Sequence, residues 1–314
     1  MEDFLTKLSK QTVLQISGVD TRKYLHGQVS VELENWQSNT ARFAAHCDFK
    51  GKMWNSFLIC DQGENMLISG HHEANTVSLE QLKKYGVFSK VEIREAEEYS
   101  IFVGAGKDVE KLVEDMFASA PQSYMSTVQN DFGVAIRMDF EYTTYKLILN
   151  ADGVKYVEQN AATLIDEQLG EQYVEYLEIG AGIGNIQAKT VGEFVPQMLN
   201  LQYLNAIDFD KGCYMGQEVV ARTKFLGKNK RATYILNANE AVSKLNIGDP
   251  VEIQVGENWR RAGKIIRFAN VNGKTRALAV LPNDTEYGTV LKLKDSTERF
   301  TVSEHPYPFE IVKQ

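Results

Sequence analysis

The chain has 314 residues, of which 43% are hydrophobic and 24% are charged, a balance typical of soluble globular proteins. This length predicts two or three packed units, and the net charge of −8 disfavours broad electrostatic wrapping around nucleic acid. The apolar runs are too short to cross a bilayer, and the acidic start Met1-Glu2-Asp3-Phe4 lacks the apolar segment of a secretory signal. We therefore expect a cytoplasmic protein without a membrane partner, whose contact with RNA, if it makes one, is local.

The metal-binding and disulfide-forming residue types are sparse. Cys47, Cys60 and Cys213 form no Cys-x-x-C pair, and His71 and His72 belong to no His-Glu-x-x-His motif. This set argues against a disulfide framework and against a zinc or iron–sulfur cage built by this chain alone. We predict no metal site.

The first 230 residues alternate short strands with helices. Asp20 is predicted to cap the first helix, which Gly27 ends, and Phe49-Lys50-Gly51-Lys52 is predicted to be the turn of a hairpin. Strands are predicted at 12–17, 43–48, 53–59, 66–69, 87–93, 99–103, 133–139 and 145–149, and helices at 21–25, 73–85, 107–117 and 156–169. Since no Gly-x-Gly-x-x-Gly turn follows a strand, this order indicates an α+β region and not a doubly wound sheet.

The pattern changes after about residue 230. Five short β-rich runs follow without a helix between them, separated by turn signals such as Gly248-Asp249-Pro250 and Asn272-Gly273. The runs lie at 232–236, 251–255, 262–268, 275–281 and 289–293. They predict a small antiparallel barrel or sandwich. We therefore expect an α+β region over 1–230 and a β domain over 231–314, with no flexible tether between them.

One segment, residues 210–222, combines a cysteine with flanking glycines: Asp-Lys-Gly-Cys-Tyr-Met-Gly-Gln-Glu-Val-Val-Ala-Arg. A helix is predicted from about Gly216 to Phe225, and Gly212 and Gly216 permit positive φ or close approach on either side of Cys213. Cys213 would then lie just before a helix N-terminus and two residues after Lys211, and both positive groups favour the thiolate. Cys213 is accordingly a candidate reactive or catalytic thiol. The spacing leaves open the alternative of a small buried apolar residue, which is how most free cysteines behave.

The same segment resembles the Lys-Gly-Cys-Phe/Tyr-x-Gly-Gln-Glu signature of the YgfZ family, relatives of the glycine-cleavage aminomethyltransferase (T protein). Further blocks resemble family sequences in family order, at 24–29, 44–54, 82–88, 194–201, 228–231 and 256–261. The residues that support Cys213 in the motif are Lys211, Gly212, Tyr214, Gly216, Gln217, Glu218 and Arg222.

The resemblance implies the T-protein fold, with two interleaved α+β domains and a C-terminal β-barrel around a central hole that holds the ligand. It also implies a protein that binds tetrahydrofolate or a folate derivative. Such a protein would support tRNA methylthiolation and iron–sulfur enzymes such as tRNA methylthiotransferases, and would influence initiation of chromosome replication. The candidate folate contacts are Tyr24, Asp48, Trp54, Asn55 and Glu178.

Two positions depart from the T-protein pattern. The Asp-Asp pair of the aminomethyltransferases is matched here by Asn55 and Ser56, neither of which acts as a carboxylate base. Aminomethyl transfer by that route is therefore expected to be absent. The glutamate that binds the pterin is matched by Gly180, and the neighbouring Glu178 is the candidate substitute.

Some candidates have a structural alternative. Tyr24 and Trp54 would stack on a pterin or pack in the core. His46 and Asp48 are expected to share one face of a strand, with Cys47 on the other, and to form either a wall of the central hole or an exposed hairpin face. Cys47 and Cys60 are expected to be structural.

Four functions fit these residues. The leading one is an accessory protein of iron–sulfur-dependent tRNA modification that uses Cys213, which would need a partner's ligands to hold a cluster. The second is a folate-dependent one-carbon (aminomethyl-type) transferase, which the missing Asp pair opposes. The third is a direct tRNA-binding module that uses Lys228, Lys230 and Arg231, which the net charge opposes. The fourth is a structural scaffold, in which Cys213→Ala would leave function intact.

Overall fold

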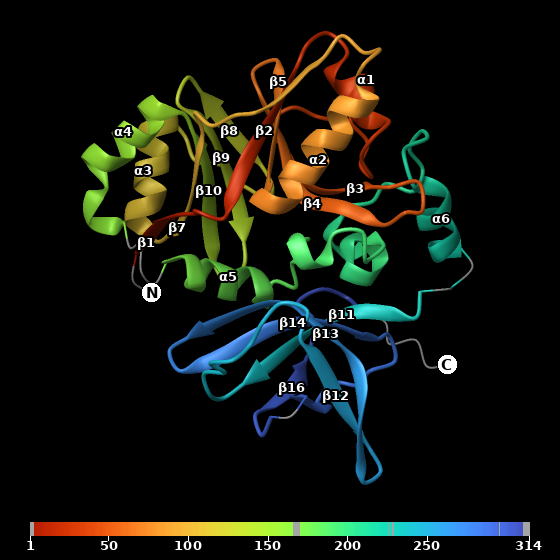
Figure 1. The fold of residues 1–314 in the computed structure, drawn as a ribbon. Coiled ribbons are helices and arrows are strands. Elements are labelled where there is room, and N and C mark those ends of the chain that lie inside the picture. Colours follow the sequence, from red (N-terminus) through yellow and green to blue (C-terminus); the bar gives the residue numbers. More distant parts are fainter. Residues whose placement is uncertain (1–2, 166–169, 226, 228, 295, 310–314) are drawn as a thin grey trace.

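The computed structural model describes residues 3–165, 170–225, 227, 229–294 and 296–309. Over these residues the chain forms two five-stranded antiparallel sheets and a closed antiparallel barrel, which lies below the sheets in Figure 1. No helix in the described part is long and apolar enough to cross a membrane. The predicted α+β fold with a C-terminal barrel is confirmed.

The first sheet has the strand order β3-β4-β5-β2-β6. Tyr24 and Leu25 of α1 and Leu82 of α2 pack against its apolar side chains in one buried core. The elements are β2 (Gln11–Ser17), α1 (Thr21–His26), β3 (Ala41–Cys47), β4 (Met53–Gln62), β5 (Asn65–His71), α2 (His72–Tyr85) and β6 (Glu92–Glu95).

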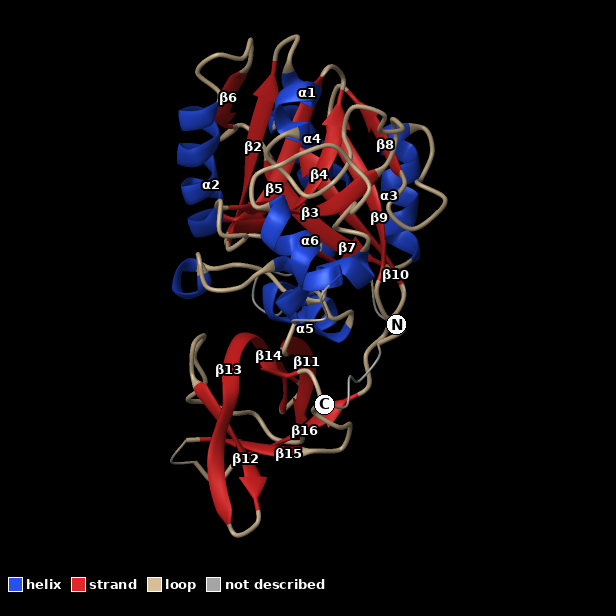
Figure 2. Ribbon diagram, turned by 90° about the vertical axis from the view of Figure 1, so that its right-hand side faces the viewer, coloured by secondary structure: helices blue, strands red, loops and turns tan. Residues whose placement is uncertain are grey.

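The second sheet has the order β1-β7-β10-β9-β8 and is covered by two further helices. Its elements are β1 (Phe4–Lys7), β7 (Ser100–Ala105), α3 (Lys107–Phe117), β8 (Thr127–Asn130), β9 (Gly133–Asp139), β10 (Thr143–Leu149) and α4 (Ala151–Asn160). Because β1 pairs with β7, the chain begins in the second sheet, builds the first and then returns. The two sheets share a buried core and lie between α2 and α3 in Figure 2.

The barrel closes in the order β11-β14-β13-β12-β15-β16. Its strands are β11 (Arg231–Ala238), β12 (Pro250–Val255), β13 (Asn258–Val271), β14 (Lys274–Pro282), β15 (Val290–Leu293) and β16 (Arg299–Ser303). The strand pattern in the sequence was compatible with a barrel or a sandwich. Because β11 pairs with both β14 and β16, the domain is a closed barrel. Since β11 begins at Arg231, we propose residue 230 as the domain boundary.

Two helices and four short 3-10 helices connect the sheets with the barrel. α5 (Gly170–Gly180) lies against β13 and β14, and α6 (Gln217–Phe225) lies at the outer side of the first sheet (Figure 1). The 3-10 segments are Ala162–Leu164, Ala188–Thr190, Pro196–Leu199 and Leu201–Leu204. α5 therefore lies between the sheets and the barrel.

Several predicted elements are wrong. The helix predicted over 156–169 is α4, which begins at Ala151 and ends at Asn160. It begins there because the Asn150 side chain accepts from the N–H groups of Asp152 and Gly153. Residues 166–169 lie outside the described residues. α5, β1, β8 and β16 were not predicted. The strand predicted from 87 begins only at Glu92, because Ser89 N–H donates to the Gly86 carbonyl in a turn. Asp20 does not cap α1: its carboxylate accepts from Lys90 N–H at 2.8 Å.

The unpredicted strand β16 supplies a core side chain that closes the barrel. Phe300 is fully buried, whereas the next residue, Thr301, is exposed. We expect Phe300→Ala to lower the free energy of unfolding by about 3–5 kcal/mol, the usual cost of emptying a buried phenylalanine site. Thr301→Ala should change it by less than about 0.5 kcal/mol. Urea unfolding of both variants measures the difference, and equal effects would contradict the barrel closure.

Candidate functional site

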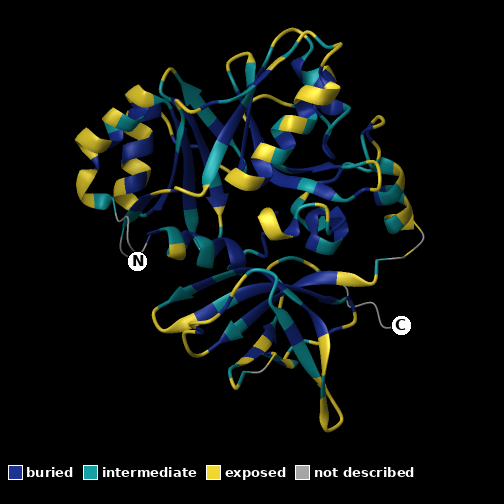
Figure 3. Ribbon diagram, in the orientation of Figure 1, coloured by how far each residue is buried: buried dark blue, intermediate teal, exposed yellow. Residues whose placement is uncertain are grey.

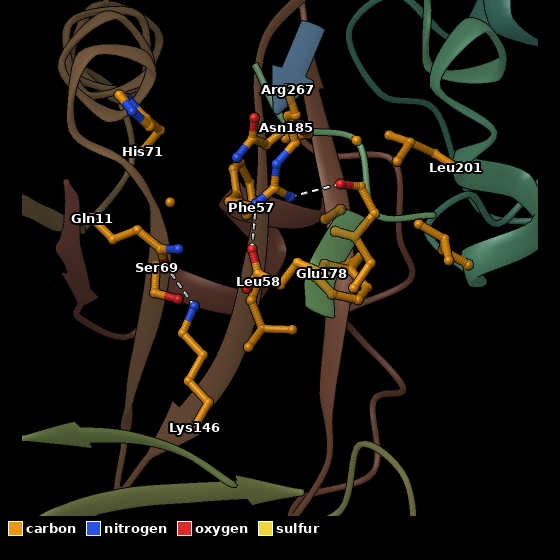
Figure 4. Close-up of a pocket in the computed structure, with 17 residues that line it drawn as sticks. Gln11, Phe57, Leu58, Ser69, His71, Lys146, Glu178, Asn185, Leu201 and Arg267 are labelled. Atoms are coloured by element: carbon orange, nitrogen blue, oxygen red, sulfur yellow. Dashed lines mark hydrogen bonds and ion pairs between the residues drawn. The ribbon is translucent and has the colours of Figure 1, made fainter. Parts of the chain in front are cut away.

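A polar cavity lies where the two sheets, α5 and the barrel meet (Figure 4). It has a volume of about 40 Å³. Its polar lining residues are Gln11, Ser56, Ser69, His71, Lys146, Glu178, Asn185 and Arg267. A cavity of about 210 Å³ shares Gln11, His71, Glu178 and Asn185 with it, and another of about 310 Å³ shares Ile183 and Leu204. The shared polar residues make the central cavity and the 210 Å³ space adjoining parts of what we call the polar interior, whereas the 310 Å³ space shares only the apolar Ile183 and Leu204.

The central cavity is organised by a buried arginine. The side chain of Arg267 on β13 is 1% exposed and binds both carboxylate oxygens of Glu175 at 2.7 Å and Glu178 Oε2 at 2.6 Å. Burial lowers the pKa of Arg267, but the two carboxylates outweigh burial and raise the pKa above its ordinary value. Arg267 also donates to the Ile183 carbonyl at 2.6 Å. Glu175 and Glu178 lie three residues apart on α5, so one helix face supplies both.

A buried lysine lies on the opposite wall. Lys146 on β10 donates to Gln11 Oε1 at 2.7 Å, as Figure 4 shows. Burial lowers its pKa, and the nearby Glu178 opposes that effect. Neither Lys146 nor Arg267 was predicted as a site residue. The sequence did contain a signal for such a residue, namely a charged side chain between apolar neighbours within a strand. Lys146, for example, lies between Tyr145 and Leu147.

Of the five candidate folate contacts, Glu178 lines the central cavity. Asn55 is fully buried on β4, and its amide donates to Asn75 Oδ1 at 2.8 Å. Its neighbour Ser56 lines the cavity, where its hydroxyl accepts from Ile186 N–H at 3.1 Å. Trp54 is half-buried, with its ring edge-on to His46 at 4.9 Å between centroids. Thus the Asn55 amide nitrogen and the Ser56 hydroxyl bind other parts of the protein, whereas Asn55 Oδ1 is buried without a hydrogen-bond partner among the described residues.

Tyr24 and Asp48 lie away from the cavity. Tyr24 packs in the core of the first sheet, its hydroxyl donates to the Leu82 carbonyl, and burial raises its pKa. The Asp48 carboxylate accepts from the N–H groups of Lys50 and Lys52, both at 2.8 Å, and so holds the β3–β4 turn. Both side chains therefore serve the fold at these positions.

The polar wall expected from His46 and Asp48 is absent among the described residues. A β-bulge between His46 and Cys47 breaks the alternation on which that prediction rested. His46 is fully buried, its Nδ1 is 2.7 Å from Ser78 Oγ, and burial lowers its pKa to about 3. Asp48 lies beyond the strand, in the turn. The expectation of a shared face is therefore wrong.

A larger side chain at Gly180 would displace the guanidinium of Arg276. A Cβ at Gly180 would lie 2.2 Å from Nη1 of Arg276, which binds Glu141 at 2.8 Å and lies 3.8 Å over the ring of Tyr176. The barrel thus fills the place where the resemblance puts the pterin-binding glutamate. Recognition of a pterin would depend on Glu178.

The lining residues fit a flat polar heterocycle such as a pterin ring. The carboxylate of Glu178, the amide of Asn185 and the hydroxyl of Ser69, which has no hydrogen-bond partner among the described residues, supply acceptors and donors. Ligand pockets usually enclose about 300–1,000 Å³. The central cavity of about 40 Å³ and the adjoining space of about 210 Å³ together stay below that range, so binding of such a ring requires the two spaces to open into one another.

Lys211 of the motif is a buried anchor. Its ammonium donates to the carbonyls of His26, Val29 and Val31 at 2.6, 2.7 and 2.8 Å. Burial lowers the pKa of Lys211 to about 8, against the attraction of Glu32 and Asp208. Its three N–H bonds all point to these carbonyls, so Lys211 is not the partner of the Cys213 thiol that the spacing predicted.

The two glycines of the motif are required by close packing, as predicted. A Cβ at Gly212 would lie 2.9 Å from His26 Nε2. Gly216 has φ +83°, and a Cβ there would lie 2.6 Å from the Asp48 carbonyl oxygen and 3.1 Å from Cys47 Cβ. Tyr214 between them is buried, and burial raises its pKa. The motif is thereby held against α1 and the β3–β4 turn.

Cys213 lies on the exposed half of the motif. It is exposed, whereas Cys47 and Cys60 are buried, and burial raises the pKa of Cys60 to about 12. The alternative of a buried packing residue is therefore wrong for Cys213. Gln217 is half-buried, whereas Glu218 and Arg222 are exposed and lie 3.6 Å apart. None of the motif residues lines the three cavities, so the structure separates the thiol from the candidate ligand site.

The role of Lys211 as an anchor can be tested by substitution. Lys211→Met keeps the length of the side chain but leaves three buried carbonyls without their donor. We expect a loss of about 3 kcal/mol in the free energy of unfolding, since one buried polar group without a partner costs about 1–3 kcal/mol. Lys230→Met, at an exposed lysine, is the control. Unchanged stability with altered reactivity of Cys213 toward a thiol reagent would instead make Lys211 a partner of the thiol.

Comparison with known proteins agrees with this geometry. The family model described as YgfZ, β-barrel domain, matches residues 229–296. The tRNA-modifying protein YgfZ of Pectobacterium atrosepticum is 34% identical over 309 residues, which cover 98% of this chain and 92% of that protein. The protein of the same name from Shigella sonnei is 33% identical over 313 residues, covering 98% and 94%.

A solved structure shares the fold at low sequence identity. The glycine cleavage system aminomethyltransferase T from Bartonella henselae superposes with a TM-score of 0.77 at 11% identity, covering 97% of this chain and 86% of that one. The fold that the resemblance implied is thus confirmed. With about one third of its residues identical to curated relatives over nearly its whole length, the chain belongs to the YgfZ family.

Proposed function

We propose that this protein is an accessory factor of tRNA modification that acts through the exposed thiol of Cys213. The observation that carries the proposal is the motif's construction: Lys211, Gly212 and Gly216 fix the backbone on both sides, and Cys213 alone among the cysteines is exposed. The relatives named tRNA-modifying protein support the pathway. An exposed and rigidly held thiol suits contact with a second macromolecule.

We further propose that the protein supports iron–sulfur enzymes such as tRNA methylthiotransferases in the cytoplasm. Through them it would affect replication initiation. Cys213 supplies one ligand or one redox-active thiol, so a cluster held at this point would take its remaining ligands from the partner. The exposed position of Cys213 is compatible with such sharing.

We also propose that the polar interior binds tetrahydrofolate or a folate derivative, with Glu178 and Asn185 at its ring. A bound folate would supply a one-carbon carrier, and the residues named here would orient its ring. Aminomethyl transfer is opposed by two features: Asn55 is bound to Asn75, and Ser56 accepts from the backbone of Ile186. No carboxylate base stands at either position.

Deletion of the gene in its host tests the pathway. We expect methylthiolated tRNA nucleosides to fall, to return with the wild-type gene and to stay low with Cys213→Ala or Cys213→Ser, because neither variant has a thiol. Mass spectrometry of hydrolysed tRNA measures the nucleosides, and immunoblotting controls for protein level. Full rescue by both variants would exclude a role of the thiol, and unchanged nucleosides after deletion would refute the pathway.

Ligand-dependent stability tests the polar interior. Tetrahydrofolate at 100 times its dissociation constant should stabilise the wild type by about 2.7 kcal/mol. We expect Glu178→Gln to lose this stabilisation, whereas Glu141→Gln, at an exposed carboxylate on Arg276, should keep it. Thermal unfolding with and without ligand gives the comparison. Retained stabilisation in Glu178→Gln would remove Glu178 from the ligand site.

A further inference from the structure

The exposed half of the motif belongs to a larger surface, which we call the α6 surface. Its exposed side chains come from the β3–β4 turn, the motif and α6: Phe49, Lys50, Cys213, Glu218, Arg222, Lys224 and Phe225. The turn and the helix are in direct contact, because a Cβ at Gly51 would lie 2.9 Å from Val219 Cβ and 3.3 Å from the Gly216 carbonyl oxygen. Figure 3 shows exposed segments at the β3–β4 turn and along the neighbouring α6.

Two aromatic side chains on this surface are open to solvent. Phe49 is 74% exposed and Phe225 is 69% exposed, one from the turn and one from the end of α6. Large apolar side chains are usually buried, and exposed ones that cluster mark interaction sites. Each phenyl ring offers a flat face on which another ring can stack.

Cations lie beside these rings. Lys224 Nζ is 3.8 Å from the centroid of the Phe209 ring and 5.5 Å from that of Phe225, and Lys50 Nζ is 5.5 Å from that of Phe49. No ion pair joins Lys50 or Lys224 to an acidic residue in the described part of the chain. Arg222 has a 3.6 Å contact with Glu218, an exposed pair of the kind that contributes little. The surface is thus locally basic on a chain of net charge −8.

Interleaved rings and cations are the arrangement by which proteins bind single-stranded nucleic acid. Bases stack on the aromatic rings while lysine and arginine contact the phosphates. We propose that the α6 surface binds an unpaired stretch of tRNA, with bases on Phe49 and Phe225 and phosphates on Lys50 and Lys224. The proposal rests on the proposed role in tRNA modification and deepens it, because it places the RNA beside Cys213. A protein partner would also bury exposed rings of this kind, and the experiment below distinguishes such a partner from tRNA.

A second surface of similar composition provides a matched control. At the end of α2, Phe88 is fully exposed and Lys84 is also exposed. Lys84 Nζ lies 5.4 Å from the ring centroid of Tyr85, much as Lys50 lies near Phe49. This surface contains no residue of the cysteine motif. Substitutions there remove the same kinds of side chain away from Cys213.

The test is binding of an unmodified tRNA transcript to the full chain, followed by fluorescence anisotropy at several salt concentrations. The double variant Phe49→Ala/Phe225→Ala should bind about tenfold more weakly or worse, since each base–aromatic stack contributes about 1–3 kcal/mol. Lys50→Gln/Lys224→Gln should also weaken binding and reduce the slope of log affinity against log salt by about 2. Phe88→Ala and Lys84→Gln should stay within about twofold of the wild type. All six positions are exposed, so melting temperatures should not change.

Three results would overturn the proposal: no tRNA binding by the wild type, unchanged binding by both α6 double variants, or equal weakening by the α2 controls. A protein from the host that is retained by the wild type and lost with the α6 variants, without tRNA binding, would assign the surface to a protein partner instead. These failures differ from failure of the proposed function. If deletion lowers methylthiolated nucleosides while the purified chain binds no tRNA, the pathway stands and the α6 surface is not its RNA contact.

Discussion

One buried cation, Arg267, joins the barrel to α5, next to a hydrophobic core that the barrel shares with β3, β4 and the segments after α5. A guanidinium that is 1% exposed needs carboxylate and carbonyl partners, because an unpaired charge in the interior is strongly destabilising. Glu175 and Glu178 of α5 and the Ile183 carbonyl supply them. Because Arg267 belongs to the barrel and its partners belong to α5 and the following loop, the pairing fixes the barrel beneath the two sheets. The walls of the central cavity follow from that placement.

A second buried cation, Lys211, holds the motif in place, as Arg267 holds the barrel against α5. Its partners are backbone carbonyls and not carboxylates. Three backbone carbonyls surround its ammonium, so the charge is satisfied without a carboxylate in contact. The result is a short segment with one buried side and one exposed side. Tyr214 faces the interior and Cys213 the solvent. The geometry therefore explains why a lysine, two glycines and an aromatic residue accompany the cysteine: they determine where the thiol lies.

How far the sequence predicted this structure depended on the range of the interactions. Strand β9 was predicted with its observed bounds, since alternation along seven residues is a local signal. β1 was missed because it is short and its partner β7 is distant in sequence. β16 is also short, and one of its two partners, β11, is distant, although the other, β15, precedes it directly. The helix over 156–169 was misplaced because the capping role of Asn150 was overlooked. For the site, the motif glycines were predicted correctly from backbone requirements, whereas Arg267 and Lys146 became significant only when folding brought them to one cavity.

The fold is shared with an aminomethyltransferase, yet the polar groups at the corresponding positions have structural partners here. Asn55 binds Asn75, Ser56 binds the backbone of Ile186, and Arg276 fills the space beside Gly180. These contacts join the Asn55 amide nitrogen, the Ser56 hydroxyl and the Arg276 guanidinium to other parts of the protein, and of the two β4 side chains only Asn55 Oδ1 lacks a partner among the described residues. The thiol of Cys213, which we propose as the reactive group, is exposed on the outside. A partner can reach it there without entering the interior, which is the property that an accessory protein needs and a small-molecule transferase does not.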